Sequence, residues 1–209
     1  LEQLVDLYDG CVLEVDQMIS RIVNELKDRG DYEDTLIVVT SDHGEAFGEK
    51  SFRDDITLAQ HVIGAHECLL HVPLLVKSPG QQEKAEITEP ATLTKFPAVA
   101  REPQQSFVTD EVYAMDSGLN EVNAEMLEKW VGERDERFFG TLWVRYHEEG
   151  NCTIKDMKWG DKQVSFNLDT GEEQQQALEF EFEEQGVMVE TETGVDQSVE
   201  KRLEELGYR

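Results

Sequence analysis

Three shortages narrow the possible functions: the sequence has few basic residues, few cysteines and no long apolar run. Lys and Arg total 19 against 46 Asp and Glu, so the formal net charge is −27 at pH 7. A chain this acidic repels nucleic-acid phosphates and anionic lipids, which argues against both as partners. A membrane-spanning helix needs about 18 apolar residues in a row, so no membrane insertion is expected. The cysteines include no C-x-x-C pair and are interpreted as ordinary thiols.

The surplus of acidic residues is spread along the chain among aliphatic and aromatic residues, which argues against disorder. A hydrophobic fraction of 39% is enough for a folded core. The chain is either an ordinary acidic protein or one adapted to molar salt, where a Debye length of about 3 Å screens its self-repulsion. The absence of a basic patch favours a halophilic, haloarchaeal protein. Because the chain begins at Leu1 and enters a helix at once, we expect a fragment, in which the absence of a signal peptide is uninformative. A cytoplasmic location is expected.

The N-terminal part of the chain alternates helical and strand patterns. Apolar residues at three- and four-residue steps predict one amphipathic helix with a buried stripe over residues 3–29, ended by Gly30 at its C-cap. The β-branched run 35–40 predicts a central strand covered on both faces, as in a parallel sheet. A short helix is expected around residues 61–70 and a second buried strand over 71–77. This order indicates an α/β fold.

The pattern changes in the second half of the chain. Residues 81–106 are polar and contain several prolines, which predicts an irregular connection with about one helical turn. Residues 138–146, 152–159 and 163–168 indicate three antiparallel strands joined by tight turns. A surface helix is expected over residues 195–206, where apolar residues again recur at helical spacing.

The strand expected over residues 35–40 leads directly into the sequence Asp42-His43-Gly44-Glu45. Ligands of α/β sheets bind outside the carboxyl ends of the strands, and Gly44 allows a sharp bend there. An Asp oxygen and a His nitrogen then give two ligands for a divalent cation. Glu45 is interpreted either as a partner that orients His43 or as the acid of a D-x-x-E capping box that opens a helix. The residues alone leave both interpretations open.

An ordered set of short motifs surrounds this turn. The set consists of Tyr8, Asp9, Val12 and Asp16 on the first helix, the Thr-Ser-Asp-His-Gly-Glu turn at 40–45, and the His-Val-Pro-Leu-Leu-Val strand at 71–76. It resembles the second half of the core of the sulfatase family, in the alkaline phosphatase superfamily. The Asp-His-Gly-Glu form is similar to the branch with many archaeal and bacterial sulfatases and phosphonate monoester hydrolases. The ending at 203–208 also resembles the L-x-x-L-G-Y ending of that family.

The resemblance implies a fold in two parts. Residues 1–105 are expected to form the C-terminal half of an alkaline-phosphatase-like α/β core with a parallel sheet. Residues 106–209 are expected to form a small antiparallel β-sheet subdomain with a C-terminal helix.

The resemblance also implies a site. Asp42 and His43 are expected to bind a divalent metal, Ca²⁺ first, with Mn²⁺ or Mg²⁺ as alternatives. His61 stands where the family has a His or Lys that contacts the sulfuryl or phosphoryl group, as a catalytic and substrate-binding residue. Its alternative interpretation is a histidine at a helix N-terminus. Lys50 is a further candidate for substrate binding.

The nucleophile of the family is missing from this chain. No Cys or Ser is followed by x-P-x-R, the motif whose Cys or Ser becomes formylglycine, so that cofactor is expected only upstream. The resemblance also implies further Asp ligands near the start of the core. Two ligands do not hold a hard cation tightly. We therefore expect these 209 residues to be inactive alone.

Three functions stay open. The parent protein hydrolyses sulfate esters, or it acts on phosphate esters as a phosphodiester or phosphonate hydrolase or a phosphoglycerol-type transferase. The third is a non-catalytic sulfatase-like module, favoured by a stretch from His43 to His61 that is longer than the family pattern, with an apparent insertion at 50–55. The upstream nucleophile motif discriminates between the first two. The oligomeric state does not follow from the sequence.

Overall fold

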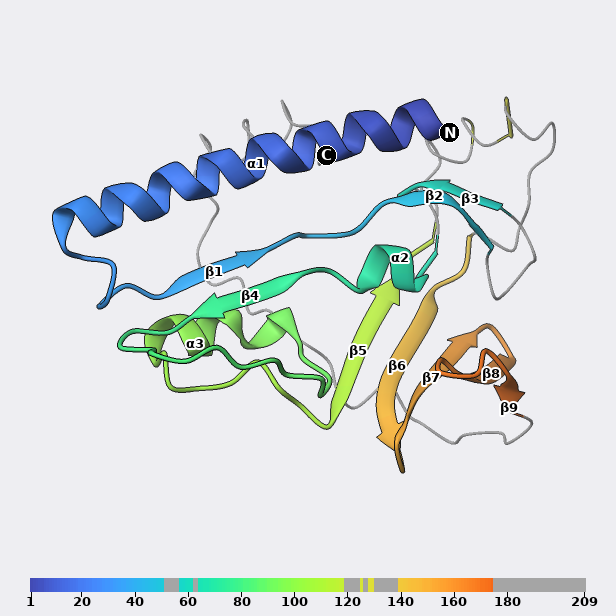
Figure 1. Ribbon diagram of the computed structural model, residues 1–209. Helices are drawn as coiled ribbons and strands as arrows, with labels where there is room; N and C mark the ends of the chain where they lie inside the picture. Colours follow the sequence, from blue (N-terminus) through green and yellow to red (C-terminus); the bar gives the residue numbers. More distant parts are fainter. Residues whose placement is uncertain (51–56, 62–63, 119–124, 126–127, 130–138, 175–209) are drawn as a thin grey trace, which may run out of the picture. The chain divides into compact units, whose positions relative to one another are not determined.

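The computed structural model (Figure 1) describes most of the N-terminal part and the central sheet. The described residues are 1–50, 57–61, 64–118, 125, 128–129 and 139–174. The insertion residues 51–55, the helix expected at 195–206 and the ending at 203–208 lie outside them. The chain separates into two compact units, Leu1–Leu178 and Glu179–Arg209, and all described residues belong to the first. No helix among the described residues is long and apolar enough to cross a membrane.

The long first helix is confirmed as α1, Glu2–Arg29. Gly30 ends it in the left-handed conformation at φ 78°, and its N–H donates to the carbonyl oxygens of Leu26 and Lys27. Glycine adopts this conformation without steric cost, so the C-cap follows from the sequence. Lys27 and Arg29 in the last turn also favour the negative end of the helix dipole.

The apolar stripe of α1 is not buried, contrary to the sequence-based expectation. No residue of the helix is buried, and Leu7 and Met18 are 68% and 59% exposed. Half-buried positions are Val5, Ile19, Val23 and Leu26. Helical periodicity predicts an apolar face, but it does not indicate which element, if any, covers that face. The described residues leave this stripe accessible.

The two strands expected in a parallel sheet pair antiparallel instead. β1 (Ile37–Thr40) and β4 (Leu74–Lys77) form a two-stranded sheet in which Ile37 faces Lys77 and Thr40 faces Leu74. Neither strand is covered on both faces, because Thr40 is exposed and Leu75 is 61% exposed. A short run of β-branched residues predicts a strand but not the direction of its neighbour. The expectation of a parallel, doubly covered pair is therefore wrong for these strands.

A strand rather than a helix follows the Asp-His-Gly-Glu turn. β2 (Ala46–Lys50) pairs antiparallel with β3 (Thr57–Gln60), with an irregular register between Phe47 and Lys50. Gly48 has a φ of 107° within β2, a conformation that a helix does not contain. The capping-box interpretation of Glu45 is therefore wrong.

The short helix expected around residues 61–70 is confirmed only at its end, as α2 (Glu67–Leu70). Its N-cap is His66, whose side chain accepts a hydrogen bond from the Cys68 N–H. Farther along, the irregular connection carries the single helical segment expected of it, η1 (Leu93–Lys95) continued by α3 (Phe96–Arg101).

Five antiparallel strands follow in a simple meander, and each pairs with the next along the chain. The strands are β5 (Glu111–Asp116), β6 (Leu142–Glu149), β7 (Cys152–Trp159), β8 (Lys162–Asn167) and β9 (Glu173–Gln174). The three predicted strands correspond to β6, β7 and β8, with β6 shifted toward the C-terminus. β5 and β9 were not predicted. Since β5 precedes its partner by a long stretch of chain, no hairpin signal marks it.

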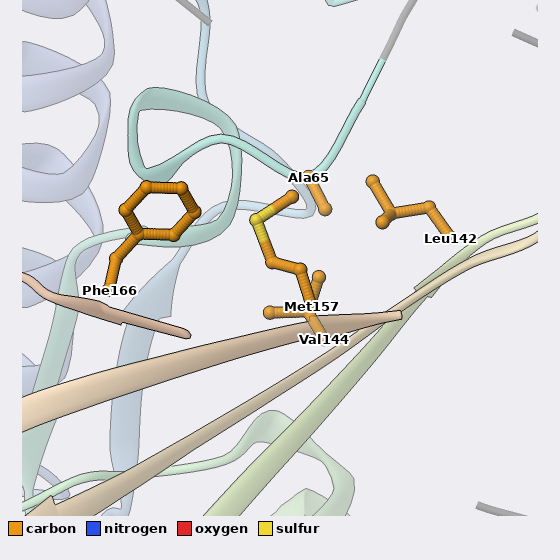
Figure 2. Close-up of a cluster of buried hydrophobic side chains, with 5 residues drawn as sticks. All are labelled: Ala65, Leu142, Val144, Met157 and Phe166. Carbon is orange, nitrogen blue, oxygen red and sulfur yellow. The ribbon is translucent and has the colours of Figure 1, made fainter. Parts of the chain in front are cut away.

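The main core lies on one face of this sheet. The buried side chains on this face pack with Ala65 and are Leu142, Val144, Met157 and Phe166 (Figure 2). Ala65 comes from the segment just before α2, so this cluster joins that segment to the sheet. Val144 is 0% exposed and Ala65 is 4% exposed. The burial of such side chains supplies the main favourable term in folding.

Candidate active-site turn

The turn after β1 is held by its own side chains. The Ser41 hydroxyl donates to the His43 carbonyl oxygen at 2.6 Å. The His43 backbone N–H donates to Asp42 Oδ1 at 3.0 Å. Ser and Asp side chains commonly close turns by bonding to nearby backbone groups. The sequence Ser-Asp-His therefore folds locally into a turn that places the Asp and His side chains beside each other.

Gly44 attaches this turn to α2. Its N–H donates to the Leu69 carbonyl oxygen at 2.8 Å. A Cβ on Gly44 would lie 1.9 Å from the Cys68 carbonyl oxygen, so no other residue fits without a backbone shift. Gly44 does not adopt a positive φ. The glycine is therefore required for close approach of two backbones, not for the sharp bend that the sequence suggested. The buried side chains of Ala46 and Leu69 pack beside this contact.

The hydrogen bond of the His43 ring is compatible with metal binding through Nε2. Its Nδ1 lies 2.8 Å from the Gly44 carbonyl oxygen, which only accepts, so Nδ1 carries the hydrogen. In the neutral ring, Nε2 then carries the lone pair that a metal-bound histidine needs. This Nε2 lies 3.8 Å from Asp42 Oδ1, and the two side chains are 41% and 63% exposed. A carboxylate oxygen and an imidazole nitrogen thus lie close together and open to solvent.

Two donors alone do not complete a metal site. Among the described residues, no group of three or more His, Cys, Asp or Glu side chains is arranged to hold an ion. The donor types fit a divalent cation, but their number falls short of the six to eight oxygen ligands typical of Ca²⁺. Metal binding by Asp42 and His43 therefore stays a prediction.

The structure places His61 against the turn. Its ring stacks on the His43 ring with centroids 4.2 Å apart and an interplanar angle of 28°. On its other side, His61 Nδ1 lies 2.9 Å from Glu45 Oε2. Glu45 therefore contacts His61, while His43 is oriented by the backbone of Gly44. The catalytic role assigned to His61 stays a prediction.

Lys50 is the last residue of β2 and is exposed. It lies opposite Thr57 in the β2–β3 pair. Its role in substrate binding stays a prediction.

A buried ionic cluster adjoins the core and was missed from the sequence. Lys155 is 0% exposed, and its Nζ donates to Glu67 Oε1 and to the Ala65 carbonyl oxygen, each at 2.5 Å. The Tyr146 hydroxyl donates to the same Glu67 oxygen at 2.9 Å. Burial lowers the pKa of Lys155, and the charge of Glu67 opposes that shift. The sequence signal that could have revealed this cluster is the position of Lys155 two residues before Met157, on the same face of β7.

A second buried network lies on the opposite face of the sheet. Asp156 is 0% exposed and accepts from Arg145 at 2.9 and 2.6 Å and from the Ser165 hydroxyl at 2.8 Å. His147 Nε2 lies 3.0 Å from the same carboxylate. Burial by itself would lower the pKa of Arg145, but the hydrogen bonds and charge of Asp156 raise it overall. This buried carboxylate is paired, as a folded protein requires.

Comparison with known proteins agrees with the resemblance in the N-terminal part. Residues 2–101 match the family model described as Sulfatase. This segment contains the Asp42–Glu45 turn and His61, and it ends with α3. No solved structure matches the chain.

Individual relatives align over shorter stretches. A multifunctional alkaline phosphatase superfamily protein, PehA of Trinickia caryophylli, is 32% identical over 85 residues, 41% of this chain and 15% of the relative. Phosphoethanolamine transferase EptA of Salmonella typhimurium is 46% identical over 48 residues, 23% of this chain and 9% of the relative. Arylsulfatase K of Bos taurus is 30% identical over 87 residues, 41% of this chain and 15% of the relative. The chain therefore spans a small part of the length of these relatives.

Proposed function

We propose that this chain is part of a metal-dependent sulfuric ester hydrolase, to which it contributes two metal ligands and a substrate-binding histidine. The observation that carries the proposal is the stack of His61 on His43 beside Asp42, inside the segment that matches the sulfatase family model. Two adjacent polar side chains, Asp42 and His43, thus meet a third, His61, from a later segment, just after β1.

Asp42 Oδ1 and His43 Nε2 are the atoms that would hold the metal, Ca²⁺ first and Mn²⁺ or Mg²⁺ as alternatives. A divalent cation bound there would stabilise the negative charge that develops on the ester oxygens. The Gly44 carbonyl oxygen accepts from His43 Nδ1 and orients the ring, which leaves Nε2 as the nitrogen that would bind the metal. The remaining ligands and the nucleophile would come from other parts of the parent protein.

His61 would bind the substrate through Nε2, because Nδ1 is engaged by Glu45. In its protonated form the ring donates a hydrogen bond to a nonbridging oxygen or a proton to the leaving oxygen. Glu45 would hold the ring in place through its contact with Nδ1. The Glu45 side chain is the less exposed partner, at 21% against 52% for His61. Lys50 would add a second cationic contact from the end of β2.

Phosphate-ester chemistry is the second candidate. It is favoured by the 46% identity over 48 residues with a phosphoethanolamine transferase. The same ligands and the same histidine would serve either ester, because sulfate and phosphate groups are both tetrahedral and both carry anionic nonbridging oxygens. Aryl sulfates and aryl phosphodiesters offered to the parent protein would separate the two by their kcat/KM values.

A metal titration tests the site without any need for catalysis. Mn²⁺ is added to the 209-residue chain, and the ring signals of its histidines are followed by NMR. We expect Mn²⁺ to broaden the His43 and His61 signals first and to leave His147, in the five-stranded sheet, sharp. Asp42→Ala should remove this selectivity, while Asp161→Ala, in the β7–β8 turn, should preserve it. Equal broadening of all histidines in the wild type, together with no metal dependence of the parent protein, would support a non-catalytic module instead.

Activity provides the second test. We expect the parent protein to lose ester hydrolysis on Asp42→Ala, and the 209-residue chain alone to hydrolyse neither ester. Hydrolysis by the isolated chain that disappears in its Asp42→Ala variant would contradict the second expectation, because it would place a complete active site within this sequence.

A further inference from the structure

α2 lies between the candidate turn and the five-stranded sheet. On the side of the turn, the Leu69 carbonyl oxygen accepts from the Gly44 N–H, and the Leu69 side chain packs on Ala46. On the side of the sheet, Ala65 packs with the core residues of β6, β7 and β8 (Figure 2). Leu70 packs against the same cluster. One short helix therefore contacts both the turn and the sheet.

The sheet holds α2 through two polar side chains on its core face. Tyr146 of β6 and Lys155 of β7 lie directly opposite each other. Lys155 donates to the Ala65 carbonyl oxygen, which precedes α2, and to Glu67, the first residue of α2. Tyr146 donates to the same Glu67 oxygen at 2.9 Å. These hydrogen bonds define where α2 begins relative to β6 and β7.

Burial makes this arrangement specific. Lys155 is 0% exposed, and an ammonium group in that environment is tolerated only when it is paired. Its partners are a backbone oxygen and a carboxylate at fixed positions, so a shift of α2 would leave the charge without them. Hydrophobic contacts alone would allow α2 to slide on the sheet, whereas directional hydrogen bonds do not.

The position of α2 in turn restricts the candidate site. Glu67 and Leu69 belong to the same four-residue helix, so displacement of one moves the other. The Gly44 backbone lies so close to Cys68 that the space between them would not hold a methyl group. The Gly44 carbonyl oxygen then accepts from His43 Nδ1 and sets the direction of that ring.

We propose that Lys155 and Tyr146 are positioning residues for the Asp42–His43 turn, which act through α2. The five-stranded sheet then determines how closely the two proposed metal donors and His61 are held together. What the turn does chemically rests on the proposed function, but the mechanical coupling does not. The competing possibility is that the cluster stabilises the sheet and has no effect on the turn.

Hydrogen exchange in the 209-residue chain tests the coupling directly. The variant Lys155→Met keeps the length of the side chain but removes its donors. We expect the Gly44 amide to exchange about tenfold faster in this variant, because local opening of the α2–turn contact becomes easier. The amides within β6 and β7 should keep their wild-type rates relative to one another. The ring signals of His43 should shift, since its orientation depends on Gly44.

Arg145→Met is the matched control. It breaks the Asp156 network in the same two strands but on the opposite face. We expect it to speed exchange within the sheet and to leave the Gly44 amide and the His43 ring signals unchanged. Lys155→Met with Glu67→Gln, which also removes the buried carboxylate charge, should still show fast exchange at Gly44.

The outcome decides between the two possibilities. Wild-type exchange at Gly44 and unshifted His43 signals in folded Lys155→Met would overturn the proposal, as would equal effects of Arg145→Met. If Lys155→Met does not fold, the same measurements on Tyr146→Phe, which loses a single hydroxyl, decide the question in the same way. None of these measurements involves metal or substrate. Ester hydrolysis by the parent protein that survives Asp42→Ala, with positive exchange results, would therefore reject the proposed function and leave the coupling intact.

Discussion

The N-terminal part of this chain and its five-stranded sheet differ in where chemistry and burial lie. Residues 2–101 carry the candidate site and match a family model, yet the longest helix of that segment has no buried residue. The sheet carries none of the predicted site residues but contains buried ionic groups, including Lys155 and Asp156 at 0% exposure. Polar chemistry in the first region is open to solvent, and in the second it is built into the core. The buried ionic groups and the residues of the proposed site thus lie in different regions, joined at α2.

The largest expected effect is at the buried ion pair. Lys155→Met should lower the free energy of unfolding by about 3–5 kcal/mol, because the Glu67 carboxylate is left without its cation. Among the described residues, Glu67 Oε2 has no hydrogen-bond partner even in the wild type. Urea unfolding followed by circular dichroism measures the loss. Adding Glu67→Gln should recover part of it, and no recovery would show that packing of the lysine stem dominates.

The same substitution in the two regions should have different costs. Val144→Ala removes methyl groups from a side chain that is 0% exposed and should cost about 2 kcal/mol through lost burial and a cavity. Val12→Ala, on α1 at 52% exposed, should change stability by about 0.5 kcal/mol or less. Unfolding curves for both variants provide the comparison. A large loss from Val12→Ala would mean that the stripe of α1 is covered in solution.

Two glycine substitutions should act with opposite signs. Gly44→Ala places a Cβ 1.9 Å from a carbonyl oxygen and should destabilise by about 1–3 kcal/mol, with a shifted His43 ring signal. Gly10→Ala, within α1, meets nothing within 4 Å. It should stabilise by about 0.5–1 kcal/mol, because alanine is the better helix former. Thermal unfolding measures both, and a stable Gly44→Ala with unchanged NMR signals would contradict the close approach at the turn.

The buried tyrosine of the cluster predicts a pH dependence at the alkaline end. Burial raises the pKa of Tyr146, and the charge and hydrogen bond of Glu67 raise it further. Above the ordinary value of 10.0 the unfolded chain loses this proton while the folded protein keeps it. Stability from the group is therefore full below about pH 10 and falls above it, by at most about 1.4 kcal/mol per pH unit.

Tyr146→Phe should make this alkaline decline shallower. Lys155 acts in the opposite direction, since burial lowers its pKa below 10.5 and its contribution rises with pH up to that value. Urea unfolding between pH 9 and 11 distinguishes the two contributions. An unchanged slope in Tyr146→Phe would mean that the hydroxyl is not buried against Glu67.

The smallest effect is expected from salt. At a net charge of −27, raising KCl from about 0.1 M to 1 M shortens the Debye length from about 10 to 3 Å and should raise the melting temperature by several degrees. Because the acids are spread over both regions, no single variant should abolish the rise. A flat response would argue for an ordinary acidic protein, so the halophilic origin stays a prediction until this is measured.

Local elements were predictable where one short segment contains the whole signal. α1 and its Gly30 cap follow from periodicity and from the special conformation of glycine. The three central strands of the sheet follow from alternation and from turns at Gly150 and Gly160, both with positive φ. Asp42, His43 and His61 were predicted as one site from a family resemblance, and the structure brings His61 onto His43.

What failed depends on partners distant in the sequence. The antiparallel pairing of β1 with β4 and the role of β5 require knowledge of neighbours, which hydrophobic pattern does not encode. The burial of Lys155 was not predicted, because lysine is ordinarily a surface residue. The contact of Glu45 with His61 likewise depends on the β2–β3 pair, where a helix was an alternative.

The sequence by itself therefore determined α1, its Gly30 cap and the three central strands of the sheet, since helical periodicity, glycine conformation and strand alternation are local properties. The roles of Asp42, His43 and His61 stay predictions. Only the tertiary structure decided that no residue of α1 is buried, that Gly44 meets the backbone of α2 and that a buried lysine ties α2 to the sheet. Those outcomes depend on which surfaces exclude water and which charges find partners, and both arise only when distant segments meet.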